Sequence, residues 1–297
     1  MDTTLIRPRS TAAQYRDVIG IFKLRISVLI TLTALAGLAI VPAPMPAPWQ
    51  IVLLAIAVLM ASAAAGAFNQ YVEADSDRLM KRTRERAFAS GALARGPLWL
   101  CVIGAMLALA CAMAAWGING VAAVFVLLGA LTYGGLYTLW LKRRTHWNIV
   151  FGGLAGSFAV LAGAAAADAA VPPQAWALAL VLFLWTPPHF WSLSIAAEAD
   201  YRAAGVPMLP VVVGTERAAR IVHTAALTLV ASSLLLVVFG AGWTVGAGAV
   251  LGGAYFLRRT RALARAPRRE TAMAAFFASM TQLSVLLLAV FLDAILR

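Results

Sequence analysis

Residues 49–77 read WQIVLLAIAVLMASAAAGAFNQYVEADSD, an apolar run that passes directly into an acidic one. The first part, Trp49 to Phe68, carries no charge. About 20 apolar residues in helical form span the hydrocarbon core of a bilayer. This stretch therefore predicts a membrane helix that ends in a group of polar side chains.

Uncharged runs of similar length recur along the whole chain of 297 residues. Only 12% of the residues are charged, whereas soluble globular domains carry about 25%. The composition excludes an ordinary soluble protein, and the runs predict an all-α, polytopic membrane protein with nine transmembrane helices. The expected spans are Ile19 to Val41, Trp49 to Phe68, Pro97 to Trp116, Val121 to Leu139, Ile149 to Ala167, Trp176 to Ile195, Ile221 to Phe239, Ala241 to Leu257 and Thr271 to Leu296. The seventh and eighth are separated at Gly240-Ala241-Gly242-Trp243, because a glycine-rich turn with an interfacial Trp suits a hairpin.

The basic residues predict the orientation of these helices. The chain has 24 Lys and Arg against 12 Asp and Glu, a net charge of +12, which in a soluble protein would suggest nucleic acid. Nine alternating crossings place 23 of the 24 basic residues on one side, leaving only Arg297 on the other. By the positive-inside rule that side is the cytoplasm, and the N-terminus lies there. We expect a single membrane domain over residues 1–297, opening with a polar cytoplasmic segment over residues 1–18, in a bacterial inner membrane and without a nucleic-acid partner.

The first candidate site follows the second span. If that helix continues, Asn69, Glu73 and Asp77 lie at i, i+4 and i+8, on one face within an arc of about 80°. Hard cations such as Mg2+ take oxygen ligands of this kind, together with phosphate oxygens and water. Arg82 and Arg86 come next, and guanidinium groups bind phosphate oxygens bidentately. The pattern favours a metal–diphosphate site; a solvated loop whose charges only set the topology is the alternative.

Three further segments are expected on the same side. The first is the basic block Lys142-Arg143-Arg144-Thr145, and the second is the loop from Asp200-Tyr201 to Gly214, which two prolines and two glycines exclude from a simple helix. The third is Trp185-Thr186-Pro187-Pro188-His189-Phe190-Trp191, where the double proline is expected to break or kink the sixth helix. His189 is then expected to face a cavity or another helix, although a lone His in an apolar helix is more often a packing residue.

These motifs together resemble the protohaem IX farnesyltransferases, a branch of the intramembrane aromatic prenyltransferases. The residues that carry the resemblance are Asn69-xxx-Glu73-xxx-Asp77-xx-Met80-x-Arg82-Thr83-xx-Arg86, the Lys142 block, Pro187-Pro188-His189-Phe190-Trp191, and Asp200-Tyr201-xxx-Ala204-Gly205-Val206-Pro207-Met208-Leu209-Pro210. Four separated motifs in the expected order make the resemblance specific.

The resemblance implies a nine-helix bundle around a central cavity, with farnesyl diphosphate and haem b as substrates and haem O as product. It implies Mg2+ held by Asn69, Glu73, Asp77 and Asp200, which are then the catalytic residues. Diphosphate would be bound by Arg82, Arg86, Lys142, Arg143 and Tyr201, and His189 would contact the haem. It also suggests a haem A synthase or a terminal oxidase as the partner that receives the product, besides membrane lipid; the sequence leaves that transfer open.

Two departures from the family pattern and two alternatives accompany this hypothesis. Ala87-Phe88 follows Arg86 where the family usually has Pro-Leu, and Glu198 stands where basic residues are common. Glu198 then either assists metal binding or leaves diphosphate to be bound by the arginines of the first loop.

Prenylation of another aromatic acceptor, as in quinone synthesis, is one alternative function. A transporter or non-catalytic haem carrier is the other, although no span has a carboxylate or Arg near its middle.

Overall fold

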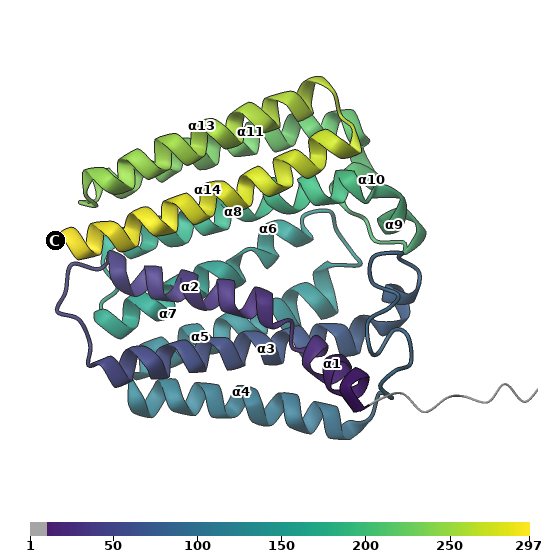
Figure 1. The fold of residues 1–297 in the computed structure, drawn as a ribbon, viewed down its shortest axis with the longest axis horizontal. Helices are drawn as coiled ribbons and strands as arrows, with labels where there is room; N and C mark the ends of the chain where they lie inside the picture. The colour runs from purple at the N-terminus through teal and green to yellow at the C-terminus, as the bar shows by residue number, and fades with distance from the viewer. Residues whose placement is uncertain (1–10) are drawn as a thin grey trace, which may run out of the picture.

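The computed structural model describes residues 11–297, and within that range the chain is helical and has no β-strand. Figure 1 shows the helices lying side by side in one bundle. In chain order they are α1 Thr11–Ile21, α2 Leu24–Ile40, α3 Pro48–Arg78, α4 Pro97–Gly117, α5 Gly120–Leu131, the π-helix η1 Thr132–Leu141, α6 Asn148–Gly152, α7 Leu154–Ala167, α8 Pro173–Ala196, α9 Glu198–Ala203, α10 Leu209–Val213, α11 Thr215–Ser233, α12 Leu235–Val238, α13 Trp243–Arg265 and α14 Arg269–Leu296. The predicted polar segment over residues 1–18 lies partly outside the described residues, and α1 begins at Thr11.

The helices follow the predicted spans closely. In the described part of the chain, eight helical segments are long and apolar enough to cross a membrane. α13 is a further helix of 23 residues, packed against α14 and α11, but the arginines toward its end keep it out of that apolar group. The turn that separates α12 from α13 lies at Gly240–Gly242, where the sequence placed it. The chain is thus a multi-pass membrane protein; the ninth crossing and the side of the N-terminus stay predictions.

Several predicted spans are built from two helical pieces. The first bends between α1 and α2 at Lys23, whose φ of 49° and ψ of 43° are left-handed. The fourth changes from α5 into the wider turns of η1 at Thr132. Bends and π-turns of this kind move side chains out of the register of a straight helix and are frequent at functional sites.

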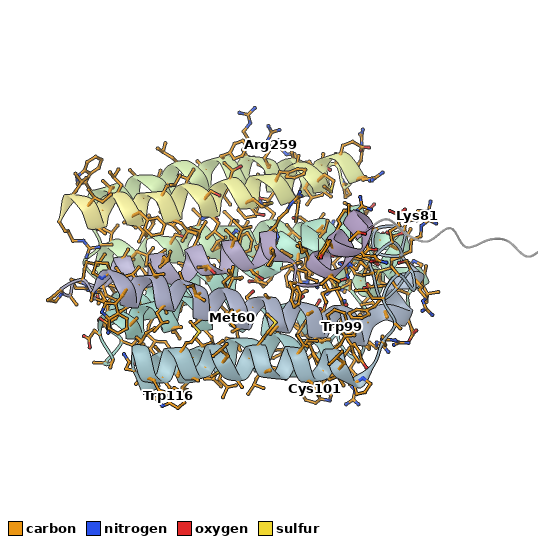
Figure 2. The ribbon with its side chains drawn as sticks, turned by 60° about the horizontal axis from the view of Figure 1, so that its bottom comes forward. Met60, Lys81, Trp99, Cys101, Trp116 and Arg259 are labelled. Atoms are coloured by element: carbon orange, nitrogen blue, oxygen red, sulfur yellow. The ribbon has the colours of Figure 1, made fainter. Side chains whose placement is uncertain are left out.

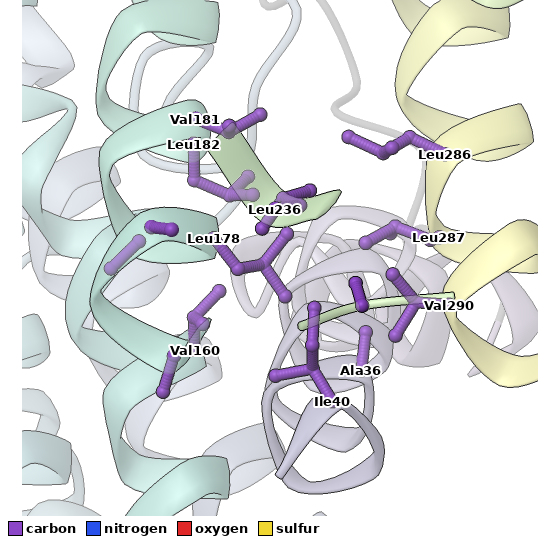
Figure 3. Packing of buried hydrophobic residues seen from close by; sticks show 14 of the residues in the cluster. Ala36, Ile40, Val160, Leu178, Val181, Leu182, Leu236, Leu286, Leu287 and Val290 are labelled. Carbon is purple, nitrogen blue, oxygen red and sulfur yellow. The ribbon is translucent and has the colours of Figure 1, made fainter. Parts of the chain in front are cut away.

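Close helix packing stabilises the bundle. Lipid tails are as apolar as the helices, so helix association in a membrane depends on tight contact between backbones more than on removal of surface from water. Gly37 on α2 and Gly163 on α7 allow such contact, because a Cβ on Gly163 would lie 1.7 Å from the carbonyl oxygen of Ala34. Figure 3 shows the adjoining apolar core, in which Ile40, Val160 and Leu178 meet side chains from α12 and α14.

The outer surface is apolar, as a lipid-facing surface requires. Trp116 is 89% exposed and Trp243 is 78% exposed, both at helix ends where Trp is common at the membrane interface. Figure 2 places Trp116 and Lys81 at opposite ends of the bundle.

We call one end of the bundle the charged end; it comprises the connections 79–96 and 142–147, the segment 197–214 with α9 and α10, and the turn at 266–268. Figure 1 shows these connections gathered at one end, with the C-terminus at the other. The three predicted motif loops are therefore brought together by the topology.

Candidate functional site

The site is organised by α3, which extends past the apolar run to Arg78 as predicted. Asn69, Glu73 and Asp77 all lie in its last three turns and are buried, with exposures of 2%, 2% and 1%. Thr83 then donates a hydrogen bond from its hydroxyl to the carbonyl oxygen of Asp77, which turns the chain back over the helix end. Three oxygen-bearing side chains thus point into the protein from one helix face, as the spacing predicts.

Each of these side chains binds a cation from a different part of the chain. Lys23 Nζ donates to Asn69 Oδ1 at 2.5 Å, and Lys142 Nζ lies 2.6 Å from Glu73 Oε2. Arg86 lies 2.8 Å from Asp77 Oδ2. Arg86 and Lys142, which are predicted to bind diphosphate, thus lie against the acidic α3 residues, and the first span contributes a cation that the sequence did not single out.

Each carboxylate keeps one oxygen without a hydrogen-bond partner in the described chain. Glu73 Oε1 and Asp77 Oδ1 are buried and have no hydrogen-bond partner in the described chain. A buried carboxylate oxygen without a partner is costly, so such atoms mark places where a bound group completes the coordination. Two anionic oxygens one helical turn apart fit Mg2+, which prefers oxygen ligands.

The fourth predicted ligand, Asp200, lies on α9 and is half-buried. Within residues 11–297, no three His, Cys, Asp or Glu side chains come close enough to hold a metal by themselves. On α3 the structure therefore offers two unpaired carboxylate oxygens, whereas the Asn69 amide already contacts Lys23 and Thr138 and stays a predicted ligand. The participation of Asp200 stays a prediction.

The sequence does not single out Lys23, because Lys23 is one of the basic residues at the start of the first helix, where positive charge is typical of the cytoplasmic side. The left-handed backbone at Lys23 ends α1 and turns this side chain inward, where Nζ also donates to the Tyr133 hydroxyl at 3.2 Å. A non-glycine residue at positive φ is uncommon and is often retained at functional sites. The signal in the sequence is a lysine placed four residues inside the predicted span Ile19 to Val41, close to Arg25.

The π-helix η1 lines the same site with two tyrosines. Tyr133 and Tyr137 stack with ring centroids 5.6 Å apart, and Lys142 lies over the Tyr137 ring at 5.8 Å. Thr138 accepts a hydrogen bond from Asn69 Nδ2 at 3.0 Å and donates to the Tyr133 carbonyl oxygen. Sequence reasoning missed these three residues, since the π-turn that brings them together has no clear sequence signature.

The basic block after η1 splits into two parts. Lys142 reaches Glu73, and Asn148 holds the intervening turn by donating to the carbonyl oxygens of Lys142 and Thr145. Arg143 is exposed, and no contact of its side chain is found in the described structure. The predicted role of Arg143 in binding diphosphate therefore stays untested, whereas Lys142 is at the site.

The loop after α3 meets the loop that begins at Asp200 through Tyr201. Arg82 donates to the Tyr201 hydroxyl at 3.4 Å, and Tyr201 packs with Met80 and Met208 in one buried cluster. The Ala87-Phe88 departure also has a structural explanation, because Phe88 is buried and makes edge-to-face contacts with Tyr71 and Trp99. The loop after α3 is thus anchored on both sides of Arg86.

Glu198 is engaged within its own loop. Its Oε1 accepts from Arg202 and its Oε2 accepts from the Thr215 hydroxyl, each at 2.5 Å. The hydrogen bond from the Thr215 hydroxyl is the largest effect and holds the pKa of Glu198 below its ordinary value; burial opposes it, and Arg202 lowers the pKa further. One oxygen therefore positions α9 against α11, and the other pairs within α9.

The double proline does not break the sixth span. α8 runs without interruption from Pro173 to Ala196 with Pro187 and Pro188 inside it, so the expected break is wrong and the alternative, a kink, stays a prediction. Membrane helices tolerate proline when they are packed among other helices, and α8 packs against α11, α14 and α7.

His189 faces another helix, as expected. It is buried, its Nδ1 lies 2.7 Å from Ser279 Oγ on α14, and its ring stacks on Trp185 and Phe276. Contact with haem is not shown by these interactions and stays a proposal.

Comparison with known proteins places this architecture among prenyltransferases. The model of the UbiA prenyltransferase family matches residues 30–283. Protoheme IX farnesyltransferase 2 of Paramagnetospirillum magneticum is 52% identical over 96% of this chain and 99% of its own length. Protoheme IX farnesyltransferase of Thermus thermophilus is 38% identical over 95% of this chain and 46% of its own length.

Solved structures share the fold. A structure described as a digeranylgeranylglyceryl phosphate synthase in membranes superposes with a TM-score of 0.78 at 17% identity, covering 96% of this chain and all of that one. A UbiA homolog from Archaeoglobus fulgidus bound to DMAPP and Mg2+ has a TM-score of 0.74 at 17% identity, covering 91% of this chain and 99% of that one.

Proposed function

The chain belongs to the UbiA prenyltransferase family, and from this premise we propose that it transfers a farnesyl group from farnesyl diphosphate to a vinyl group of haem b, giving haem O. The observation that carries the proposal is the buried α3 face, where two carboxylates bind cations and keep one oxygen each without a protein partner. The names of the relatives, which are protoheme IX farnesyltransferases, support the choice of substrates.

Diphosphate is bound by the cations that surround this face. Arg86 and Lys142 already lie there, each paired with a carboxylate. Arg82 lies where the loop after α3 contacts Tyr201. Guanidinium and ammonium groups donate several charge-assisted hydrogen bonds to phosphate oxygens. Arg143 is the further predicted cation, and Tyr201 orients Arg82 through its hydroxyl.

Asn69, Glu73 and Asp77, with Asp200 from the second loop, would hold Mg2+. When bound, the metal supplies positive charge that makes diphosphate a better leaving group. The free oxygens Glu73 Oε1 and Asp77 Oδ1 are the acceptors that fit it. The UbiA homolog from Archaeoglobus fulgidus with DMAPP and Mg2+ supports a metal in this fold.

The farnesyl transfer forms a carbon–carbon bond between farnesyl C1 and the vinyl group of haem b. The bond between farnesyl C1 and the diphosphate oxygen breaks, and its electron pair leaves with diphosphate. The vinyl group donates its π electrons to C1, and the cation left on the vinyl carbon is captured by water, which then loses a proton. The product carries a hydroxyethylfarnesyl group, and pyrophosphate is released. The apolar interior of the bundle keeps bulk water from the allylic cation before the new bond forms.

The charged end would lie in the cytoplasm, with nine crossings of a bacterial inner membrane. The gathering of the basic connections at one end of the bundle supports this orientation by the positive-inside rule. Farnesyl diphosphate would then enter from the side where its diphosphate is soluble, and its tail would lie among the apolar helices. A haem A synthase or a terminal oxidase is the class of protein to which the product would pass.

The proposal is tested by the product. Purified protein is incubated with Mg2+, farnesyl diphosphate and either haem b or 4-hydroxybenzoate, and the products are identified by mass spectrometry. We expect haem O with the first acceptor and no prenylated 4-hydroxybenzoate with the second. Formation of only the second product would assign quinone synthesis, and formation of neither would favour a haem carrier.

A further inference from the structure

A second group of basic residues lies apart from the diphosphate site, on the side of the bundle formed by α11 and α13. The two helices pack together, and His223 Nδ1 lies 2.9 Å from Thr260 Oγ1 across their contact. Between Thr215 and Glu270 every basic residue other than His223 is an arginine. The eight arginines are Arg217, Arg220, Arg258, Arg259, Arg261, Arg265, Arg268 and Arg269. The proposed transfer assigns no role to any of them.

These arginines do not hold the protein together through ion pairs. Among the described residues none of the eight forms a salt bridge, although Glu216 and Glu270 lie in the same stretch of chain. All except Arg259 are exposed. Exposed positive charges that gather on one side of a protein repel one another and raise the local concentration of anions. An anion from outside the chain is therefore the partner that this side of the bundle attracts.

The outward face of α13 changes from apolar to basic partway along the helix. Leu251 is exposed, and Arg258 and Arg265 follow it at intervals of seven residues, which is about two helical turns each time. The face of α11 repeats this pattern, because Leu227 is exposed and Arg220 stands seven residues before it. A ligand in contact with these arginines therefore lies beside side chains that face lipid.

The arginines begin well before the end of the bundle. The apolar part of α13, from Trp243 to Leu257, rises about 22 Å at 1.5 Å per residue, whereas the hydrocarbon core of a bilayer is about 30 Å thick. Figure 2 shows Arg259 set back along the bundle from the end at which Lys81 lies. On α4, by contrast, exposed apolar side chains extend to Leu98 in the first turn, next to the charged end. The polar boundary is therefore deeper on the α13 side.

A boundary of this depth brings arginine side chains to the level of lipid phosphates. A helix whose apolar stretch is shorter than the hydrocarbon core draws the bilayer surface toward it, or extends its long basic side chains to that surface. Arg259 has this border position, since its guanidinium carbon lies 5.4 Å from the ring centroid of Tyr255, and tyrosine is common at membrane interfaces. Guanidinium groups bind phosphate oxygens bidentately. A phosphate that carries its own acyl chains fits both the charge and the apolar surroundings.

We propose that the outward face of α11 and α13 binds the phosphates of anionic phospholipids. We call it the basic face; it is formed by Arg220, Arg258, Arg261 and Arg265. The phosphodiester accepts hydrogen bonds from the guanidinium groups, and the acyl chains lie along the exposed apolar side chains farther along the same helices. Phosphatidylcholine has the same phosphate, but its choline places a positive charge beside the arginines, so it binds more weakly. This binding does not depend on the farnesyl transfer.

The test compares two lipids that differ only in their headgroups. Full-length protein in detergent is titrated with phosphatidylglycerol or with phosphatidylcholine of identical acyl chains, and native mass spectrometry reports the fraction of protein with bound lipid. We expect the wild type to bind phosphatidylglycerol about 10-fold more tightly than phosphatidylcholine. Equal binding of the two lipids would overturn the proposal and leave the face to an acidic protein partner.

Two double variants separate the basic face from net charge. Arg258→Gln/Arg261→Gln should weaken phosphatidylglycerol binding by about 10-fold and leave phosphatidylcholine binding unchanged. Lys81→Gln/Arg84→Gln is the matched control, because it removes two exposed charges from the connection 79–96 and should keep the preference of the wild type. The same loss in both variants would show that net charge alone attracts the lipid and would overturn the proposal.

Arg220→Gln tests the face from the other helix. We expect it to weaken phosphatidylglycerol binding by about threefold. The thermal midpoint in detergent checks folding, and we expect no change, since none of these arginines forms a salt bridge within residues 11–297. Unchanged lipid preference in both Arg220→Gln and Arg258→Gln/Arg261→Gln would overturn the proposal.

Discussion

Two buried aspartates, one at each end of the bundle, have opposite surroundings. Asp293, near the end of α14, has both oxygens satisfied: Oδ1 accepts from the Thr244 hydroxyl, and Oδ2 accepts from the Gly242 backbone N–H and from Arg297. Asp77, at the charged end, pairs with Arg86 through Oδ2 and leaves Oδ1 buried without a partner.

The difference separates a structural carboxylate from a binding one. A carboxylate that only joins helices gains most when every lone pair accepts a hydrogen bond. A carboxylate that binds a cation from outside the chain instead keeps one oxygen without a hydrogen-bond partner, although burial of that oxygen costs free energy. Glu73 follows the pattern of Asp77, since its Oε1 is also unpaired.

Asp77→Asn gives the largest expected effect. The change keeps the shape of the side chain but removes the charge from the free oxygen, so the metal and diphosphate lose their anchor. We expect haem O formation to fall by about 100-fold or more, as measured by mass spectrometry in detergent. The variant should remain folded, since Arg86 can still donate to the Asn carbonyl oxygen.

Asp293→Asn provides the contrast. An amide nitrogen at this position would face the donors of Gly242 or Arg297, so we expect a loss of about 1–3 kcal/mol in stability. The thermal midpoint should fall, while haem O formation per folded molecule stays within about twofold of the wild type. Equal loss of activity in the two variants would show that the open oxygen of Asp77 has no special role.

Lys23→Met tests the cation that the sequence did not single out. Lys23 holds the side chain of Asn69, a proposed metal ligand, so loss of this contact should loosen the metal–diphosphate site, and we expect KM for farnesyl diphosphate to rise about tenfold with a smaller change in kcat. Arg25→Met is the control, because Arg25 is exposed and lies two residues away. The same rise in both variants would mean that Lys23 acts only through net charge.

The smallest expected effect concerns Glu198, whose pKa lies below its ordinary value of 4.5 in the folded protein. A lowered carboxyl pKa contributes stability that is present above the ordinary pKa and is lost as the pH falls below it. The wild type should therefore have the higher thermal midpoint relative to Glu198→Gln at pH 7, and this difference should disappear toward about pH 3.

Glu216→Gln removes an exposed carboxylate nearby and should follow the wild type across this range. A constant difference between the wild type and Glu198→Gln at every pH would show that ionisation of Glu198 does not matter.

The features that sequence could predict are those that depend on local pattern. The apolar runs predict the helices, and the spacing of Asn69, Glu73 and Asp77 predicts their shared face, because both follow from helix geometry alone. The structure has these features where they were expected. The family motifs also identified the arginine and lysine that pair with the acidic residues.

The remaining features depend on contacts between distant segments. Lys23 reaches Asn69 only because the chain bends at a left-handed residue, and Asp293 is satisfied by groups about fifty residues earlier. The double proline does not break α8 for a related reason, since contacts with helices that are distant in sequence allow a membrane helix to retain proline.

The central claim is that the open carboxylate oxygens on α3 bind a divalent cation together with diphosphate. Its most direct test is a Mn2+ titration of the purified protein with inorganic pyrophosphate, in which the EPR signal of free Mn2+ reports binding. We expect saturable binding in the wild type and in Asp293→Asn, and an affinity weaker by about 10-fold or more in Asp77→Asn. Equal Mn2+ affinity in all three proteins would contradict the account.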